Sequence, residues 1–97
     1  MAAVSACFQI GDSVYVRKAF PPGHIRTPYY IRGKKGIVAD VLAAFPNPED
    51  RAKGEDGDPV QPLYRVRFLQ TVAWRNYDGS PEDTLDIEIF QHWLEPT

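Results

Sequence analysis

The sequence predicts an all-β fold, a small closed barrel of about five short strands with one long acidic loop. Apolar and polar side chains alternate along several short segments, which is the period-two pattern of half-buried strands. The 97 residues include nine prolines and seven glycines, which favour turns over helices. A chain of this length supports one modest hydrophobic core, so we expect a single domain.

The first expected strand covers residues 13–18 and follows a turn at Gly11-Asp12. Val14 and Val16 face one side of this strand, and polar or aromatic residues face the other. This alternation predicts a strand with one face against the core.

The second expected strand covers residues 36–41. Gly33 and Gly36 flank Lys34-Lys35, a pattern that is typical of a tight turn just before the strand. In the strand itself Ile37, Ala39 and Val41 alternate with Val38, Asp40 and Leu42.

Residues 45–62 are rich in proline, glycine and acidic side chains and have no periodicity, so we expect a long exposed loop. Alternation returns in residues 63–69. There Tyr64, Val66 and Phe68 are expected to point inward, with arginines between them pointing outward.

A turn is expected at residues 76–82, where Asp, Gly, Ser and Pro follow one another, and a last strand at residues 85–90. Residues 72–74 and 92–94 fit either short strands or turns.

Closing such strands into a barrel removes sheet edges that a small domain cannot otherwise protect. An SH3-like barrel suits the chain length and strand count. We expect residues 1–7 to form a flexible tail and residues 8–97 to form the barrel. Trp74 and Trp93 are expected in the core of that barrel rather than as a platform for stacked bases.

The charge of the chain is unevenly distributed. Net charge is −2, yet residues 13–39 carry six basic side chains and no acidic one. Cys7 is the single cysteine, so the chain has no internal disulfide and no cysteine-based metal site, which is compatible with a reducing cytosol. The N-terminal residues resemble neither a signal peptide nor a membrane span, and we expect a cytoplasmic protein without a membrane partner.

The most informative segment covers residues 23–33. It contains two arginines, one histidine and two tyrosines, and Pro21, Pro22 and Pro28 stiffen it. A stiff loop that presents guanidinium groups is suited to hold an anion or an oxygen-rich group in fixed geometry.

Motifs of a complete enzyme are missing from the sequence: there is no phosphate-binding glycine loop, HExxH or nucleophile elbow. His24 has a suitable pKa for a general base, but a histidine bonded to the loop backbone is the favoured interpretation. Asp86 and Glu88 share a strand face, where a solvated pair is favoured over acid–base chemistry.

Several strings of residues follow a known family pattern over nearly the whole chain. They are Phe8-x-x-Gly11-Asp12-x-Val14-x-Val16, Pro22-Gly23-His24-Ile25-Arg26-x-Pro28-x-Tyr30-x-Arg32-Gly33-x-x-Gly36, Phe45-Pro46, Gly54-Glu55, Pro62-x-Tyr64-x-Val66-x-Phe68, Trp74 and Asp86-x-x-x-Phe90-x-x-x-Leu94-Glu95-Pro96. This order resembles the C-terminal barrel of the nitrile hydratase β subunit, and the G-H-x-R-x-P-x-Y-x-R-G string and the final L-E-P are its specific parts.

The resemblance implies an SH3-like barrel and a supporting role in catalysis beside a metal-bearing subunit. In this family a non-corrin Co(III) or non-haem Fe(III) lies in an α-type subunit, on cysteines of which two are oxidised. An arginine of the G-H-x-R motif, here Arg26, hydrogen-bonds to the oxidised sulfurs. We expect His24, Tyr30 and Arg32 to support the loop or the subunit interface. No metal or cofactor is expected on this chain alone.

The resemblance also implies partners, because this chain lacks the helical half that precedes the barrel in a full β subunit. We expect a separate small subunit of a split nitrile hydratase or thiocyanate hydrolase-type enzyme, inactive alone. Its partners would be the α-type metal-binding subunit and a helical chain equivalent to the missing half. The substrate would be a small nitrile or thiocyanate.

Two other functions remain open. The Gly11–Val16 and Gly33–Val38 segments also resemble the KOW-type barrels that bind nucleic acid, and a hydratase maturation or metal-delivery accessory protein is a further alternative. A sequence pI of about 5.6 argues against a nucleic-acid partner.

Overall fold

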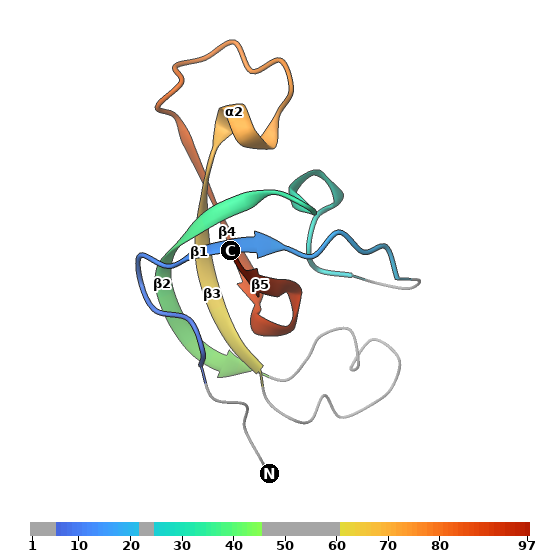
Figure 1. Ribbon diagram of the computed structural model, residues 1–97, viewed down its shortest axis with the longest axis vertical. Coiled ribbons are helices and arrows are strands. Elements are labelled where there is room, and N and C mark those ends of the chain that lie inside the picture. Colours follow the sequence, from blue (N-terminus) through green and yellow to red (C-terminus); the bar gives the residue numbers. More distant parts are fainter. Residues whose placement is uncertain (1–5, 22–24, 46–60) are drawn as a thin grey trace.

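The computed structural model describes residues 6–21, 25–45 and 61–97. These residues form five strands, one short α-helix and two 3-10 turns (Figure 1). In chain order the elements are β1 (Ser13–Val16), η1 (Tyr29–Ile31), β2 (Lys35–Phe45), β3 (Gln61–Leu69), α2 (Gln70–Ala73), β4 (Thr84–Phe90), η2 (Gln91–Trp93) and β5 (Leu94–Pro96). The expected all-β fold is confirmed.

The five strands form one antiparallel sheet in the order β4-β3-β2-β1-β5. The two outermost strands of this order, β4 and β5, are joined directly by the short turn η2. The sheet therefore curves round on itself, and Figure 1 shows the long strands β2 and β3 bending around the centre of the molecule. This is the arrangement of an SH3-like barrel.

The hydrophobic core lies inside this curved sheet and receives side chains from every strand. Val14 and Val16 of β1 and Tyr64, Val66 and Phe68 of β3 are buried, which confirms the alternation predicted for both strands. The other members of the core cluster are Phe8, Ile31, Val38, Ala73, Ile89, Trp93 and Leu94.

Several strand boundaries differ from the expectation. Strand β2 continues to Phe45 and strand β3 begins at Gln61, because the two segments pair with each other as far as Phe45↔Gln61. The ends of the expected 45–62 loop are therefore strand, and residues 46–60 lie outside the described residues. Strand β1 ends at Val16, after which the backbone N–H of Arg17 donates to the carbonyl of Trp93 instead.

Gly36 belongs to the second strand, as expected, and is not part of the turn before it. Gly33 makes the turn with a φ of +80°, whereas Gly36 lies within β2 and faces the core. A Cβ at position 36 would lie 2.7 Å from side-chain atoms of both Phe68 and Val66. Glycine is required here because the core leaves no room for a side chain.

Trp74 does not lie in the core, again contrary to the expectation, whereas the prediction for Trp93 is confirmed. The segment before Trp74 forms the helix α2, which turns the tryptophan to the surface, where 42% of it is exposed. Its ring stacks on Tyr30 with centroids 4.5 Å apart, and its Nε1–H donates to Gln70 Oε1 at 2.7 Å.

The start of the described chain is fastened to the barrel through Tyr64. The backbone N–H groups of Cys7 and Phe8 donate to its hydroxyl at 3.1 and 3.3 Å, and the hydroxyl donates to Gln91 Oε1 at 2.5 Å. Burial raises the pKa of Tyr64, so the hydroxyl stays protonated and keeps this donor role. Residues 1–5 of the expected tail lie outside the described residues.

Residues 25–33, which we call the arginine loop, are fastened to the core by Arg32. Only 7% of Arg32 is exposed. Its Nε and Nη2 donate to the carbonyl of Thr27 at 3.2 and 2.7 Å, and Nη1 donates to the carbonyl of Ala19 at 3.0 Å. The guanidinium carbon also lies over three aromatic rings, at 4.4 Å from the centroid of Tyr29, 4.8 Å from Trp93 and 5.4 Å from Phe20. Within the described part of the chain no carboxylate pairs with Arg32, so carbonyls and ring faces stabilise the charge.

We predict that Arg32→Lys lowers the free energy of unfolding by about 2–3 kcal/mol, because an ammonium cannot reach both carbonyls as the planar fork does. Urea denaturation followed by tryptophan fluorescence measures the loss. Arg17→Lys is the matched control, since the exposed side chain of Arg17 makes one hydrogen bond to the described residues, to the carbonyl of His92 at 3.2 Å. Equal losses in the two variants would contradict the role given to Arg32.

Gly36→Ala should lower the free energy of unfolding by about 1–3 kcal/mol, because the new methyl group overpacks the core. Phe68→Leu removes one of the clashing groups. The double variant should therefore be more stable than the sum of the two single losses implies, and a double-mutant cycle by denaturation measures this. Additive losses would show that the space beside Gly36 is not limiting.

Candidate functional site

The outer faces of β3 and β4 carry a ladder of paired charges. In the strand register Arg65 lies opposite Glu88, and Arg67 lies opposite Asp86. Arg67 holds Asp86 in a two-point contact, with Nε 2.9 Å from Oδ1 and Nη2 3.0 Å from Oδ2. These hydrogen bonds hold the pKa of the Asp86 carboxyl below its usual value. Asp86 and Glu88 thus share a face, as expected, and both carboxylates belong to ion pairs.

The arginine loop brings Arg26 to this ladder from a distant part of the sequence. Its Nη2 donates to Glu88 Oε1 at 3.0 Å, and its guanidinium carbon lies 5.9 Å from the ring centroid of Phe90. The other oxygen of Glu88, Oε2, lies 3.6 Å from Nη2 of Arg65. Nη1 of Arg65 lies 3.7 Å from Oδ2 of Asp40. We call Arg26, Glu88, Arg65 and Asp40 the ion-pair row.

The two arginines of the loop therefore occupy opposite environments. Arg32 is buried, and carbonyls and aromatic rings surround it. The side chain of Arg26 is 49% exposed, and its contact with Glu88 is the single hydrogen bond it makes to the described residues. Because a guanidinium has several N–H donors in a planar fork, most of the donors of Arg26 make no hydrogen bond to the described residues and can bind an anionic group.

His24 and Tyr30 are the other two expected site residues. His24 lies outside the described residues. Tyr30 is exposed at the surface, where its ring stacks on Trp74 and joins the arginine loop to α2. The expectation that both residues support the loop or an interface stays a prediction.

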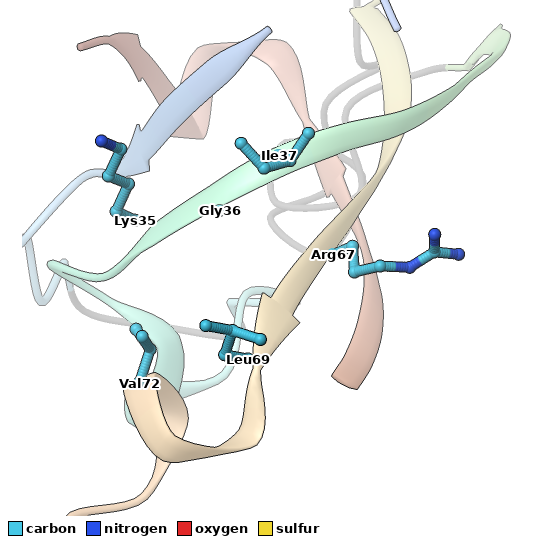
Figure 2. Close-up of a pocket in the computed structure, with 6 residues that line it drawn as sticks. All are labelled: Lys35, Gly36, Ile37, Arg67, Leu69 and Val72. Atoms are coloured by element: carbon cyan, nitrogen blue, oxygen red, sulfur yellow. The ribbon is translucent and has the colours of Figure 1, made fainter. Parts of the chain in front are cut away.

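A pocket of about 220 Å³ lies farther along the same outer face (Figure 2). Figure 2 shows Leu69 and Val72 side by side, with the charged ends of Lys35 and Arg67 pointing away from them. The surface is almost wholly apolar, so the pocket offers packing area and no group for acid–base work. Its lining residues are Lys35, Gly36, Ile37, Arg67, Leu69 and Val72.

The sequence alone did not reveal the pairing of Arg26 with Glu88 or the pocket. The first joins residues 62 positions apart in the chain. The pocket depends on the turn of α2, which the sequence pattern left undecided between strand and turn. For the pairing, the sequence offered one indication: Glu88 lies on the outward face of an alternating strand, where a carboxylate can meet a basic side chain.

Across residues 6–21, 25–45 and 61–97, no three His, Cys, Asp or Glu side chains lie close enough to hold a metal ion. Among those same residues no helix is long and apolar enough to cross a membrane.

Comparison with known proteins gives a consistent set of matches. The family model described as "Nitrile hydratase beta subunit, C-terminal" matches residues 1–96. A nitrile hydratase subunit beta from Pseudomonas putida is 35% identical over 89 residues, which is 92% of this chain and 41% of that protein. The β subunit of a low-molecular-weight cobalt-containing nitrile hydratase from Rhodococcus rhodochrous is 36% identical over 92 residues, which is 94% of this chain and 40% of that protein.

Among solved structures, a chain of the recombinant apo-enzyme of thiocyanate hydrolase from Thiobacillus thioparus matches with a TM-score of 0.90 and 31% identity. The match covers 98% of this chain and 79% of that chain. By contrast, the chain spans about two fifths of the length of the curated relatives it matches.

The likeness therefore extends through both the sequence and the fold, and it covers nearly all of the chain. It includes the G-H-x-R-x-P segment, whose residues 25–28 begin the arginine loop, and the final Leu94-Glu95-Pro96 strand. The chain belongs to the family formed by the C-terminal domains of nitrile hydratase β subunits.

Proposed function

We propose that this chain is a non-metal subunit of a multi-subunit enzyme that hydrates a nitrile to an amide or hydrolyses thiocyanate. Family membership and the close structural match to a thiocyanate hydrolase chain support the assignment. The observation that carries the proposal is the presentation of Arg26. It is the one arginine of the arginine loop whose guanidinium is half exposed and largely free to bind a group from outside the chain.

In this proposal Arg26 hydrogen-bonds to oxidised cysteine ligands of the metal in a partner subunit. Sulfinate and sulfenate oxygens are anionic acceptors, and a guanidinium offers permanently charged donors in a plane. Such a contact fixes the orientation of the ligands around the metal. Arg26 reaches its position from a loop that Arg32 holds against the core, so the donor is presented by a rigid support.

The metal belongs to an α-type partner and not to this chain. The donor set here fits an outer contact, since the exposed loop offers a guanidinium and no ligand cluster occurs among the described residues. When bound, a Co(III) or Fe(III) ion would supply a Lewis acid that activates the substrate or water. Relatives from Rhodococcus rhodochrous and Pseudonocardia thermophila are named as cobalt-containing, which favours cobalt.

A second partner would supply what the longer relatives carry beyond the matched two fifths of their length. We propose a helical chain equivalent to the N-terminal half of those β subunits. The substrate class is then a small nitrile or thiocyanate, bound between subunits, and the complex is cytoplasmic.

The outer face of β3 and β4 argues against the nucleic-acid alternative. Arg26, Arg65 and Arg67 on the outer face are all paired with carboxylates, which removes the continuous basic stripe that phosphate binding requires. No observation favours the accessory-protein alternative over the subunit assignment either.

The purified chain alone should be inactive on acrylonitrile and thiocyanate and should bind no stoichiometric cobalt or iron, because its described residues include no cluster of metal ligands. Amide and ammonia assays together with elemental analysis check this. Measured turnover or one bound metal ion per chain would overturn the subunit assignment.

In the reconstituted complex, Arg26→Lys should lower kcat by about one to two decades. The substitution keeps the charge but loses the planar fork, and a charge-assisted hydrogen bond contributes about 1.5–3 kcal/mol. The melting temperature should barely change, since an exposed ion pair contributes about 0–1 kcal/mol to folding.

Arg67→Lys is the matched control, because Arg67 is an exposed arginine of the same face that already binds Asp86 through two of its donors. It should turn over at the wild-type rate. Wild-type turnover by Arg26→Lys would contradict the role of Arg26. Loss of turnover in a folded Arg32→Lys variant, with Arg26→Lys active, would show that the wrong arginine has been assigned.

A further inference from the structure

The direction of the Arg26 side chain depends on one partner. Arg26 lies in a part of the arginine loop without regular secondary structure, before the turn η1. Among the described residues its polar contact is with Glu88, at 3.0 Å, and its aromatic contact is the ring of Phe90 at 5.9 Å. An exposed arginine with so few contacts would otherwise sample many rotamers.

Glu88, in contrast, is held on a regular element. It lies within β4, directly opposite Arg65 of β3 in the antiparallel register. Its two oxygens face two different arginines, Oε1 toward Arg26 and Oε2 toward Arg65 at 3.6 Å. Arg65 is in turn within 3.7 Å of Asp40 on β2. A side chain fixed on a strand in this way places its partner more accurately than a loop contact does.

Two arginine–carboxylate contacts on this face, Arg67 with Asp86 and Arg26 with Glu88, differ in how many guanidinium donors they use. Asp86 binds Arg67 through Nε and Nη2 together and so occupies one whole edge of that guanidinium. Glu88 binds Arg26 through Nη2 alone, at a single oxygen. The remaining edges of the Arg26 fork stay open, and the charge of Glu88 is shared with Arg65. Asp86 therefore holds Arg67 at two points, whereas Glu88 holds Arg26 at one point and leaves more of its donors available.

We infer that Glu88 is a positioning residue that fixes the guanidinium of Arg26 for the reaction. The inference rests on the proposed function, because it assigns Glu88 a role only through Arg26. The carboxylate does not touch substrate or metal; it holds one end of the fork so that the other donors are aligned toward the acceptors on the partner subunit.

The test is steady-state kinetics of the reconstituted complex, with acrylonitrile and thiocyanate as the substrates used. Glu88→Ala should lower kcat by about threefold to tenfold, because the guanidinium loses its fixed direction. KM should stay within about twofold, since Arg26 contacts ligands of the metal rather than the substrate. Glu88→Gln keeps an oxygen acceptor without the charge and should lose only about twofold.

Asp86→Ala is the matched control, because Asp86 lies on the same strand and face and is also bound to an arginine. Its kcat should equal that of the wild type. Adding Glu88→Ala to Arg26→Lys should cause no further loss, since Glu88 acts through the arginine. Subunit stoichiometry and the melting temperature of each variant complex confirm that assembly is intact.

The outcomes separate the inference from the proposed function. Wild-type turnover by Arg26→Lys overturns both. A slow Arg26→Lys together with a Glu88→Ala variant that is unimpaired or faster overturns the inference alone. An equal loss in Asp86→Ala, or an additive loss in the double variant, also overturns it, because either result means that Glu88 supports the sheet and not the guanidinium.

Discussion

The buried guanidinium of Arg32 is the interaction on which the site depends. Its hydrogen bonds to the carbonyls of Thr27 and Ala19 tie the arginine loop to the segment that leaves β1. A charged group in a protein interior is costly unless its donors are satisfied, so the loop has few other conformations in which this residue can be buried. The ring of Trp93 beneath the guanidinium links the same contact to the turn that joins β4 and β5.

With that support in place, the loop can present a second arginine to the outside. Arg26 lies over the outer face of the barrel, where cross-strand carboxylates balance the exposed basic side chains. The charges of the ion-pair row therefore sum to zero, and the guanidinium of Arg26 still has donors that are not bonded to the described residues. Such an arrangement suits recognition of a few anionic oxygens at a subunit interface rather than broad attraction to a polyanion.

The sequence predicted the parts of the fold that depend on local periodicity. Alternation in β1 and β3 identified the buried faces, because each residue there has one side in the core. It could not show why residue 36 must be glycine, because that constraint comes from two side chains of a neighbouring strand. Trp74 was misplaced for a similar reason, since its exposure follows from the short helix α2.

The candidate site was predictable only in part. The proline-bound segment identified the loop and its arginines, and the resemblance to a family selected Arg26. Neither signal could show that Arg32 is the buried member of the pair, or that Glu88 receives Arg26. Both facts depend on contacts between segments that are distant in the chain, which a one-dimensional pattern does not encode.

The central claim is that Arg26 meets oxidised metal ligands across a subunit interface. The most direct measurement is a structure of the assembled complex at a resolution that shows side chains. We expect a nitrogen of Arg26 within about 2.7–2.9 Å of a sulfur-bound oxygen, with Glu88 still on Nη2. A complex in which Arg26 faces solvent, while another group contacts the oxidised sulfurs, would contradict the claim.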